Sequence, residues 1–220
     1  MFRRRLVTAL AFLLTGIPLP ARPAGVPSLG VVTQASAAYF NASRLSAGAT
    51  VFDGDRLSTA SEGLLQIRGL DSLLYLPGLS GVTLHSLANG TQAQLLNGGL
   101  VFSSIRATAM EILANGAFIR PATDAPTVAQ VTLVGPKELR ITARRGALEF
   151  SYHSETENIA EGASYRIILD PQQTASGPPQ NQEIKLPNRK RKGFWILIIV
   201  GISWATEWAV HEALESPDRP

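Results

Sequence analysis

Two groups of residues have the types and the spacing that chemistry would need, and the first is a pair of aspartates. Asp53 and Asp55 flank Gly54 and could offer carboxylate oxygens to a calcium ion. A complete calcium loop needs further acidic ligands, and the Arg-Leu-Ser that follows Asp55 supplies none. We therefore predict a tight turn, in which Gly54 takes a positive φ and the two carboxylates cap backbone amides.

The second group is a histidine with two glutamates. His153, Glu155 and Glu157 alternate along the chain, so a strand would project all three from one face. A histidine with two carboxylates can bind a metal ion. Residues 154–158 are hydrophilic, however, and we predict a solvated loop tip there in preference to a metal site. His85 and His211 have no evident partners in the sequence.

Recognisable catalytic patterns do not occur in the sequence. There is no G-x-S-x-G elbow and no glycine-rich phosphate loop that opens a helix. The chain has no cysteine, which excludes disulfides, thiolate metal sites and cysteine nucleophiles. We predict no catalytic residue, no cofactor and no bound metal, and we expect that the protein is not an enzyme.

The positive charge of the chain lies at its two ends. The formal net charge is +3 with a pI of about 9.5. The two most basic clusters are Arg3-Arg4-Arg5 and the run formed by Arg189, Lys190, Arg191 and Lys192. Without these seven residues the remainder is mildly acidic, so the high pI does not indicate nucleic-acid binding, and we expect no nucleic-acid partner.

The N-terminal end has the organisation of an export signal. A basic Arg3-Arg4-Arg5 is followed by an apolar run over residues 6–19 and by a proline-containing stretch. This order is typical of a secretory signal peptide. We predict that residues 1–24 are a signal peptide or an uncleaved N-terminal anchor, and either one would export the domain that follows.

The C-terminal end predicts a membrane attachment. Residues 171–192 are rich in proline and glutamine and then basic, as a linker should be. Residues 193–211 are mostly apolar and just long enough for a transmembrane helix, which needs about 20 residues. Alternatively this helix lies in the interface, with Arg189, Lys190, Arg191 and Lys192 on lipid phosphates. Residues 212–220 form an acidic tail.

Small residues recur along one face of this predicted helix. Gly201, Ala205 and Ala209 follow one another at intervals of four. Such a stripe lets a second helix approach closely and would allow self-association. The alternative is an ordinary anchor that happens to be rich in glycine and alanine.

The middle of the chain, residues 28–170, has the pattern of an all-β domain. Short runs of alternating apolar and polar residues are separated by Asn-Gly, Asp-Gly and Pro-Gly turn signals. This spacing predicts a jelly roll, a β-sandwich or a β-helix-like stack. A short helix is expected near residues 108–113. The predicted strands are 64–67, 72–76, 82–84, 94–96, 100–102, 128–134, 138–143, 147–152 and 164–169.

The same region resembles FecR-type domains. Residues 45–59 contain Asp53-Gly54-Asp55, followed by Leu57 and Thr59, which is similar to the opening turn of that family. Residues 63–67 and 70–76 occupy the places of its next strand and hairpin, and residues 146–151 and 161–168 resemble its closing hairpin. The resemblance covers roughly residues 29–169, and the element Asp53, Gly54, Asp55 and Thr59 is its most specific part.

The resemblance implies a β domain on the outer side of a bacterial inner membrane. The best-known members of the family are periplasmic regulators that relay a receptor signal to a cytoplasmic anti-sigma activity. Only five residues precede the first apolar run here, so we expect no region that could hold a sigma factor. We therefore expect a non-enzymatic, membrane-tethered module of the cell envelope that binds an envelope protein or a glycan. The alternative is a transmembrane regulator of the FecR type.

Overall fold

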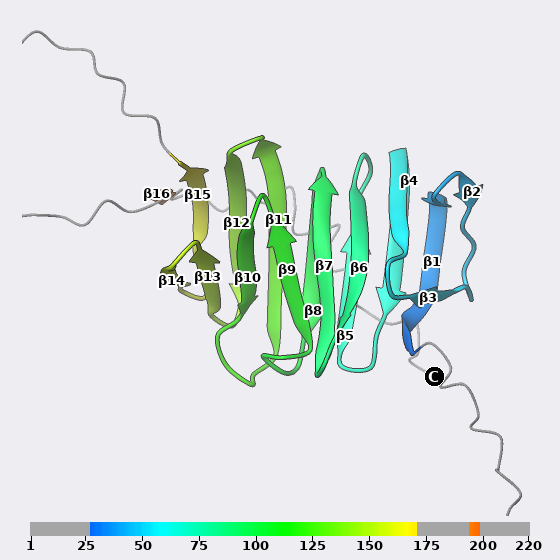
Figure 1. Ribbon diagram of the computed structural model, residues 1–220, viewed down its shortest axis with the longest axis horizontal. Helices are drawn as coiled ribbons and strands as arrows, with labels where there is room; N and C mark the ends of the chain where they lie inside the picture. The colour runs from blue at the N-terminus through cyan, green and yellow to red at the C-terminus, as the bar shows by residue number, and fades with distance from the viewer. Residues whose placement is uncertain (1–26, 171–193, 199–220) are drawn as a thin grey trace, which may run out of the picture.

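The structure is a computed structural model in which residues 27–170 and 194–198 are described, the latter as backbone only. Every regular element in these ranges is a strand, so the all-β prediction is confirmed (Figure 1). The strands are β1 (Ser28–Phe40), β2 (Ser43–Arg44), β3 (Thr50–Phe52), β4 (Arg56–Arg68), β5 (Ser72–Leu76), β6 (Gly81–Leu87), β7 (Gly90–Asn97), β8 (Gly99–Ser104), β9 (Met110–Ala114), β10 (Ala117–Pro121), β11 (Thr127–Gly135), β12 (Glu138–Arg145), β13 (Leu148–Tyr152), β14 (Glu155–Ile159), β15 (Ser164–Leu169) and β16 (Phe194–Ile198).

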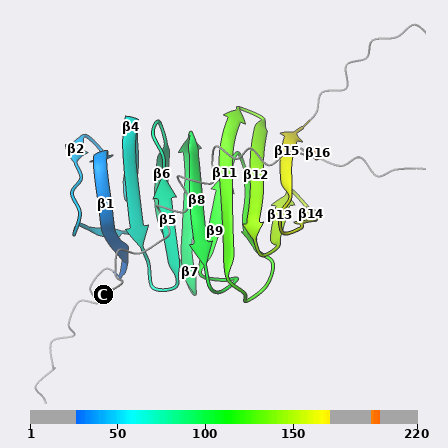
Figure 2. The same ribbon diagram turned by 180° about the vertical axis from the view of Figure 1, so that it is seen from behind.

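The strands form one sheet that folds over on itself at β4. The hydrogen-bonded order is β14-β13-β10-β9-β7-β6-β4-β5-β8-β11-β12-β15-β16. The first half of β4 pairs with β6 and its second half with β5, while β1 pairs along it and closes this end. We call β6, β7, β9, β10, β13 and β14 the first layer, seen in front in Figure 1, and the remaining strands from β5 to β16 the second layer, seen in front in Figure 2.

The core lies between the two layers because side chains alternate along every strand. In β4, β9, β12 and β13 the exposure pattern switches at nearly every residue, with the apolar members buried. The largest completely buried side chains are Phe102 on β8 and Phe150 on β13. Burial of each large apolar side chain stabilises the fold by about 1.5–3 kcal/mol, so this interior holds the domain together without disulfides.

The chain passes repeatedly from one layer to the other. It crosses between β5 and β6, β7 and β8, β8 and β9, β10 and β11, β12 and β13, and β14 and β15. Since β8 lies in the second layer, β9 returns to the first layer beside β7 and pairs with it in parallel. The first layer therefore consists of three hairpins, β6–β7, β9–β10 and β13–β14, joined by the non-local pairings of β7 with β9 and of β10 with β13.

Most predicted strands are found, with two corrections in the first layer. Residues near 108–113 were expected to form a short helix, but Met110–Ala114 is strand β9, whose alternating burial fits a half-buried strand. Residues 154–158 were expected to be a loop tip, but Glu155–Ile159 is the edge strand β14, paired with β13. In both cases an available neighbouring strand decides the local structure over the polar or helix-favouring composition.

A further correction concerns the predicted C-terminal helix. Phe194–Ile198 form strand β16, antiparallel to β15, and do not begin a helix. Phe, Trp and Ile favour extended structure, and the edge of β15 offers unpaired backbone groups. In the described ranges the structure has no helix with the length and apolarity that a membrane crossing requires. Residues 1–24, the linker 171–192, residue 193 and residues 199–211 of the predicted helix, and the tail 212–220 lie outside the described residues.

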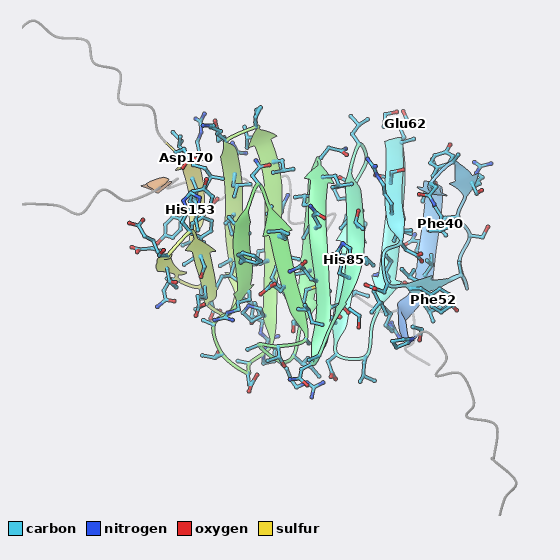
Figure 3. All side chains as sticks on the ribbon, in the orientation of Figure 1. Phe40, Phe52, Glu62, His85, His153 and Asp170 are labelled. Atoms are coloured by element: carbon cyan, nitrogen blue, oxygen red, sulfur yellow. The ribbon has the colours of Figure 1, made fainter. Side chains whose placement is uncertain are left out.

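The two layers are linked at the end opposite to β4. The Tyr152 hydroxyl, at the end of β13, donates a hydrogen bond to Asp170 Oδ2 at 2.8 Å, and Lys137 Nζ lies 4.0 Å from the same oxygen. Asp170 directly follows β15, and Figure 3 shows it beside His153, which follows Tyr152. Burial first, and the contact with Asp170 second, raise the pKa of Tyr152 above its ordinary value.

This raised pKa predicts a loss of stability at alkaline pH. The protonated hydroxyl is favoured in the folded state, so its contribution is complete below the unfolded pKa of about 10 and disappears as the pH rises through the folded value. Urea unfolding should show that Tyr152→Phe is less stable than the wild type at pH 8, by about 0.5–1.5 kcal/mol for the lost hydrogen bond. The difference should shrink at pH 11. A difference that is constant over this range would contradict the assignment.

Candidate functional site

The turn at Asp53-Gly54-Asp55 is built as the sequence predicts. Gly54 has a φ of 81°, and its amide donates to the carbonyl oxygen of Leu84 at 2.7 Å. Asp55 Oδ2 accepts a hydrogen bond from the Phe52 amide at 2.8 Å, and Asp53 Oδ1 accepts one from the Ser86 amide at 2.8 Å. The turn interpretation is confirmed, because both carboxylates cap backbone amides: Asp55 closes the turn on Phe52, and Asp53 fastens it to β6.

Thr59 is a structural centre of the fold rather than an exposed recognition residue. It is buried on β4, where its hydroxyl donates to the carbonyl oxygen of Pro77 at 2.5 Å. The Thr59 hydroxyl oxygen also accepts a hydrogen bond from the buried Ser80 amide at 3.1 Å. The Ser80 hydroxyl in turn accepts one from the Gly99 amide at 3.1 Å. Thr59 thus joins the long strand β4 to the crossing between β5 and β6.

Loss of the Thr59 hydroxyl is expected to destabilise the domain. Thr59→Val keeps the shape of the side chain and removes both hydrogen bonds, so the buried Ser80 amide loses its acceptor and the half-buried Pro77 carbonyl oxygen loses its donor. Such a loss costs about 1–3 kcal/mol for each group left unsatisfied. Chemical denaturation should show it, with Thr83→Val on the outer face of β6 changing the stability by less than about 0.5 kcal/mol. Equal effects of the two substitutions would contradict the role of Thr59.

A row of polar side chains crosses the outer face of the first layer, and we call it the polar rung. Strand registers place His85 opposite Gln92, Gln92 opposite Glu111, Arg120 opposite Glu149 and Glu149 opposite Asn158. Glu111 and Arg120 directly flank the paired Ile112 and Ile119, so the same register sets them opposite each other. The polar rung therefore consists of His85, Gln92, Glu111, Arg120, Glu149 and Asn158, on six strands; its first member, His85, is labelled in Figure 3.

Contacts along the polar rung fix its side chains. Asp53 Oδ1 lies 3.6 Å from His85 Nδ1 and joins the Asp53–Asp55 turn to the first member. Gln92 Nε2 donates to Glu111 Oε1 at 2.7 Å. Arg120 donates to Glu149 Oε1 at 2.5 Å. With Asp53, three carboxylates face one guanidinium in this row, so the surface is acidic on balance while its side chains are held in place.

A pocket of about 390 Å³ opens over one part of the polar rung. Glu111, Arg120 and Glu149 supply charged groups to its lining. The tip of the β6–β7 hairpin and the segments before β9 and after β10 complete it, with Leu87, Ala88, Asn89, Ala107, Thr108, Pro121 and Ala122. An apolar rim beside fixed carboxylate and guanidinium groups suits the binding of a polar surface or chain by hydrogen bonds.

The residues that were considered as a metal site do not form one. His153 lies in the turn after β13 with a φ of 53° and its ring centroid is 4.1 Å from that of Tyr152. Glu155 and Glu157 follow on β14. Within residues 27–170 and 194–198, no three His, Asp or Glu side chains are placed to hold a metal ion together. Gly201, Ala205 and Ala209, and the basic run Arg189, Lys190, Arg191 and Lys192, lie outside the described residues.

The opposite face of the molecule carries a comparable ion pair. On the outer side of the second layer, Arg166 on β15 donates to both oxygens of Glu138 on β12, at 2.5 and 2.9 Å. These hydrogen bonds hold the pKa of Glu138 below its ordinary value. The fractional exposure of the Arg166 side chain is 45%, close to the 52% of Arg120. Arg166 is therefore a matched reference for the polar rung.

Sequence analysis missed the polar rung, although part of it has a local signal. Glu111 and Arg120 are placed symmetrically about the Asn115-Gly116 turn signal, so this hairpin predicts their pairing. His85 and Gln92 lie symmetrically about Ala88-Asn89, one residue before the centre of the Asn89-Gly90 turn signal. The parallel pairing of β7 with β9 and the pairing of β10 with β13 unite them. No feature of the sequence indicates these two pairings.

Comparison with known proteins gives a limited likeness. No family model and no curated protein matches the chain. Among solved structures, two crystal structures described as a candidate anti-sigma factor from Parabacteroides distasonis ATCC 8503 are similar to it, with TM-scores of 0.44 and 0.42 and sequence identities of 10% and 11%. The match covers 51% of this chain and 54% of each of those chains, so the chain spans about half of their length.

Proposed function

We propose that the chain is a non-enzymatic binding module of the bacterial cell envelope, which engages a protein or glycan partner through the polar rung. The single observation that carries this proposal is the rung itself, six polar residues aligned across six strands with a pocket above them. A row of mutually fixed charges on a rigid sheet offers directional hydrogen bonds at a low entropic cost.

The chemistry of the exposed groups supports binding rather than catalysis. Asp53 and Asp55 use their carboxylates to cap amides, and the buried Thr59 and Ser80 hydroxyls serve the crossing between layers. Arg120 and Glu149 neutralise each other in a pair. None of these contacts sets a nucleophile beside a base.

Export and membrane attachment are part of the same proposal. The basic and apolar sequence of residues 1–24 supports export, and the basic linker with the apolar residues 193–211 supports a tether. The resemblance of residues 53–59 to FecR-type domains supports an inner-membrane location with the β domain in the periplasm.

The polar rung is tested by charge reversal in the full chain. Arg120→Glu places three glutamates side by side and should abolish recovery of a specific envelope partner after mild crosslinking in cells. Arg166→Glu reverses an equally exposed, ion-paired arginine on the opposite face and should leave recovery unchanged. Equal recovery from both variants and the wild type would refute the role of the rung. Unfolding of both variants should be measured alongside, since exposed ion pairs contribute only about 0–1 kcal/mol.

A second function, transmembrane signalling, is favoured by one observation. The C-terminal apolar run begins at the edge of the sheet, where β16 pairs with β15, so a change in the membrane segment would alter or release this pairing. In this case Gly201, Ala205 and Ala209 would pack against a second helix. Gly201→Leu should then alter the signalling output of cells, and unchanged output would exclude this role for the helix.

A further inference from the structure

The two ends of the folded sheet differ in how their edges are protected. β14 ends the first layer, and two of its five residues are glutamates. Charged side chains on an edge strand oppose the addition of another strand. β15 ends the antiparallel path of the second layer before β16, and its last three residues are Ile167, Ile168 and Leu169. The edge of β15, which is apolar, is paired with a further strand, β16.

The occupant of that edge is a segment of the same chain. β16 runs antiparallel to β15, with Phe194 opposite Leu169, Ile196 opposite Ile167 and Ile198 opposite Tyr165. All five of its residues are in register, without a bulge. The pairing satisfies backbone groups of β15 that would otherwise form an open template for another strand.

The same five residues begin the most apolar stretch of the C-terminal half. Phe194–Ile198 follow the basic run 189–192, and the apolar sequence continues to residue 206. In a bilayer, backbone amides and carbonyls must be satisfied within the segment, which a helix achieves and a lone strand does not. Residues Phe194–Ile198 therefore cannot pair with β15 and belong to a membrane helix at the same time.

We propose that Phe194–Ile198 are a reversible edge strand, which pairs with β15 when the protein is away from lipid and leaves it when the segment enters a bilayer. This inference rests on the proposed membrane attachment and deepens it, because it states what attachment does to the β domain.

Contacts that do not involve β16 hold β15 in the domain. Asp170, directly after β15, is held by Tyr152 from the first layer and lies 4.0 Å from Lys137. The Leu169 amide also donates to the Lys137 carbonyl oxygen at 2.8 Å. These contacts and the pairing of β15 with β12 fix β15 independently of β16. Release of β16 thus changes one edge and leaves the polar rung, on the other layer, intact.

The absence of cysteine and the position of the tryptophans allow a direct test. Arg166→Cys with Leu197→Cys places thiols at opposed positions of β15 and β16, and Arg140→Cys with Leu197→Cys places one of them a strand further away. Trp204→Phe with Trp208→Phe leaves Trp195 as the sole tryptophan. The full chain is mixed with vesicles of phosphatidylcholine and phosphatidylglycerol whose acyl chains carry bromine, which quenches tryptophan within the bilayer.

We expect the 166/197 pair to form its disulfide in buffer at least tenfold faster than the 140/197 pair, and vesicles to slow it at least tenfold. When reduced, the protein should sediment with vesicles and lose most Trp195 fluorescence to bromine. When the protein is oxidised beforehand, so that the 166/197 disulfide is closed, Trp195 should stay unquenched.

A disulfide that forms equally fast with and without vesicles, while the protein sediments with them, would contradict the exchange of β16 but not the membrane attachment. If the reduced protein does not sediment with vesicles, both the attachment and the exchange of β16 are contradicted. If the 166/197 disulfide forms no faster in buffer than the 140/197 disulfide, only the exchange is contradicted.

Discussion

Phe150→Ala should lower the free energy of unfolding by about 3–5 kcal/mol, the cost typical of a large aromatic side chain removed from a close-packed interior. Phe150 is completely buried on β13, opposite Ile119 of β10. Its removal leaves a cavity between the layers that the rigid sheets on either side cannot fill by collapse. For a domain of about 150 residues such a loss is a large part of the total stability.

Phe118 provides the matched control for this prediction. It lies on β10, opposite Ser151 and one position from Ile119, but it points outward and is 41% exposed. Phe118→Ala should cost less than about 1 kcal/mol, because little apolar surface returns to water. Urea unfolding of both variants measures the difference. Similar losses for the two phenylalanines would mean that the interior is not between these layers.

Gly98→Ala should be the most damaging of the glycine substitutions with a positive φ. Gly98 joins β7 to β8 at a φ of 72°, where a Cβ costs about 1–2 kcal/mol. A Cβ there would also lie 2.4 Å from the Leu79 carbonyl oxygen and 2.6 Å from the Ser80 hydroxyl. Both neighbours belong to the crossing that Thr59 fastens, so they cannot move without loss of its hydrogen bonds. We expect a total cost above about 3 kcal/mol.

Gly54→Ala measures the conformational cost of a positive φ without a steric contact of the added Cβ. Gly54 has a similar φ, 81°, but an added Cβ meets nothing within 4 Å. We expect a loss of about 1–2 kcal/mol, the conformational cost alone. Thermal or chemical unfolding of the two variants should therefore differ by more than about 1 kcal/mol. If Gly98→Ala lowered the free energy of unfolding no more than Gly54→Ala, the close packing of the β5–β6 crossing against the β7–β8 turn would be contradicted.

The local periodicity of the sequence was sufficient to predict most of the strands. Alternation over residues 72–76, 138–143 and 164–169 predicted β5, β12 and β15, because an antiparallel strand with one buried face shows its period directly. The Asp53–Asp55 turn itself was equally local, since the positive φ of Gly54 and the cap of Asp55 on the Phe52 amide follow from residue types a few positions apart. The contacts of Asp53 and Gly54 with β6 are long-range and were not predictable. Alternation does not state which layer a strand joins, so the folding of the sheet at β4 was not predictable.

Three short segments were predicted wrongly. β9 pairs in parallel with β7, which alternation alone does not connect to it, and its short sequence also suits a helix. β14 pairs with the adjacent β13 across a tight turn, and its hydrophilic composition also suits a loop. Phe194–Ile198 are apolar throughout, so their sequence suits a buried strand as well as a helix in lipid. The polar rung depends on the same non-local pairings. Sequence reasoning therefore found the Asp53–Asp55 turn at one end of the rung and missed the row that continues from it.

The most direct test of the account is partner capture from living cells by a photocrosslinking amino acid at position 92, in the middle of the polar rung. Its counterpart at position 142 lies at the outer, second-layer face. The account predicts a discrete crosslinked envelope partner from position 92 only, which Arg120→Glu removes and Arg166→Glu keeps. The same crosslinks from both positions, or a crosslink from position 92 that survives Arg120→Glu, would contradict it.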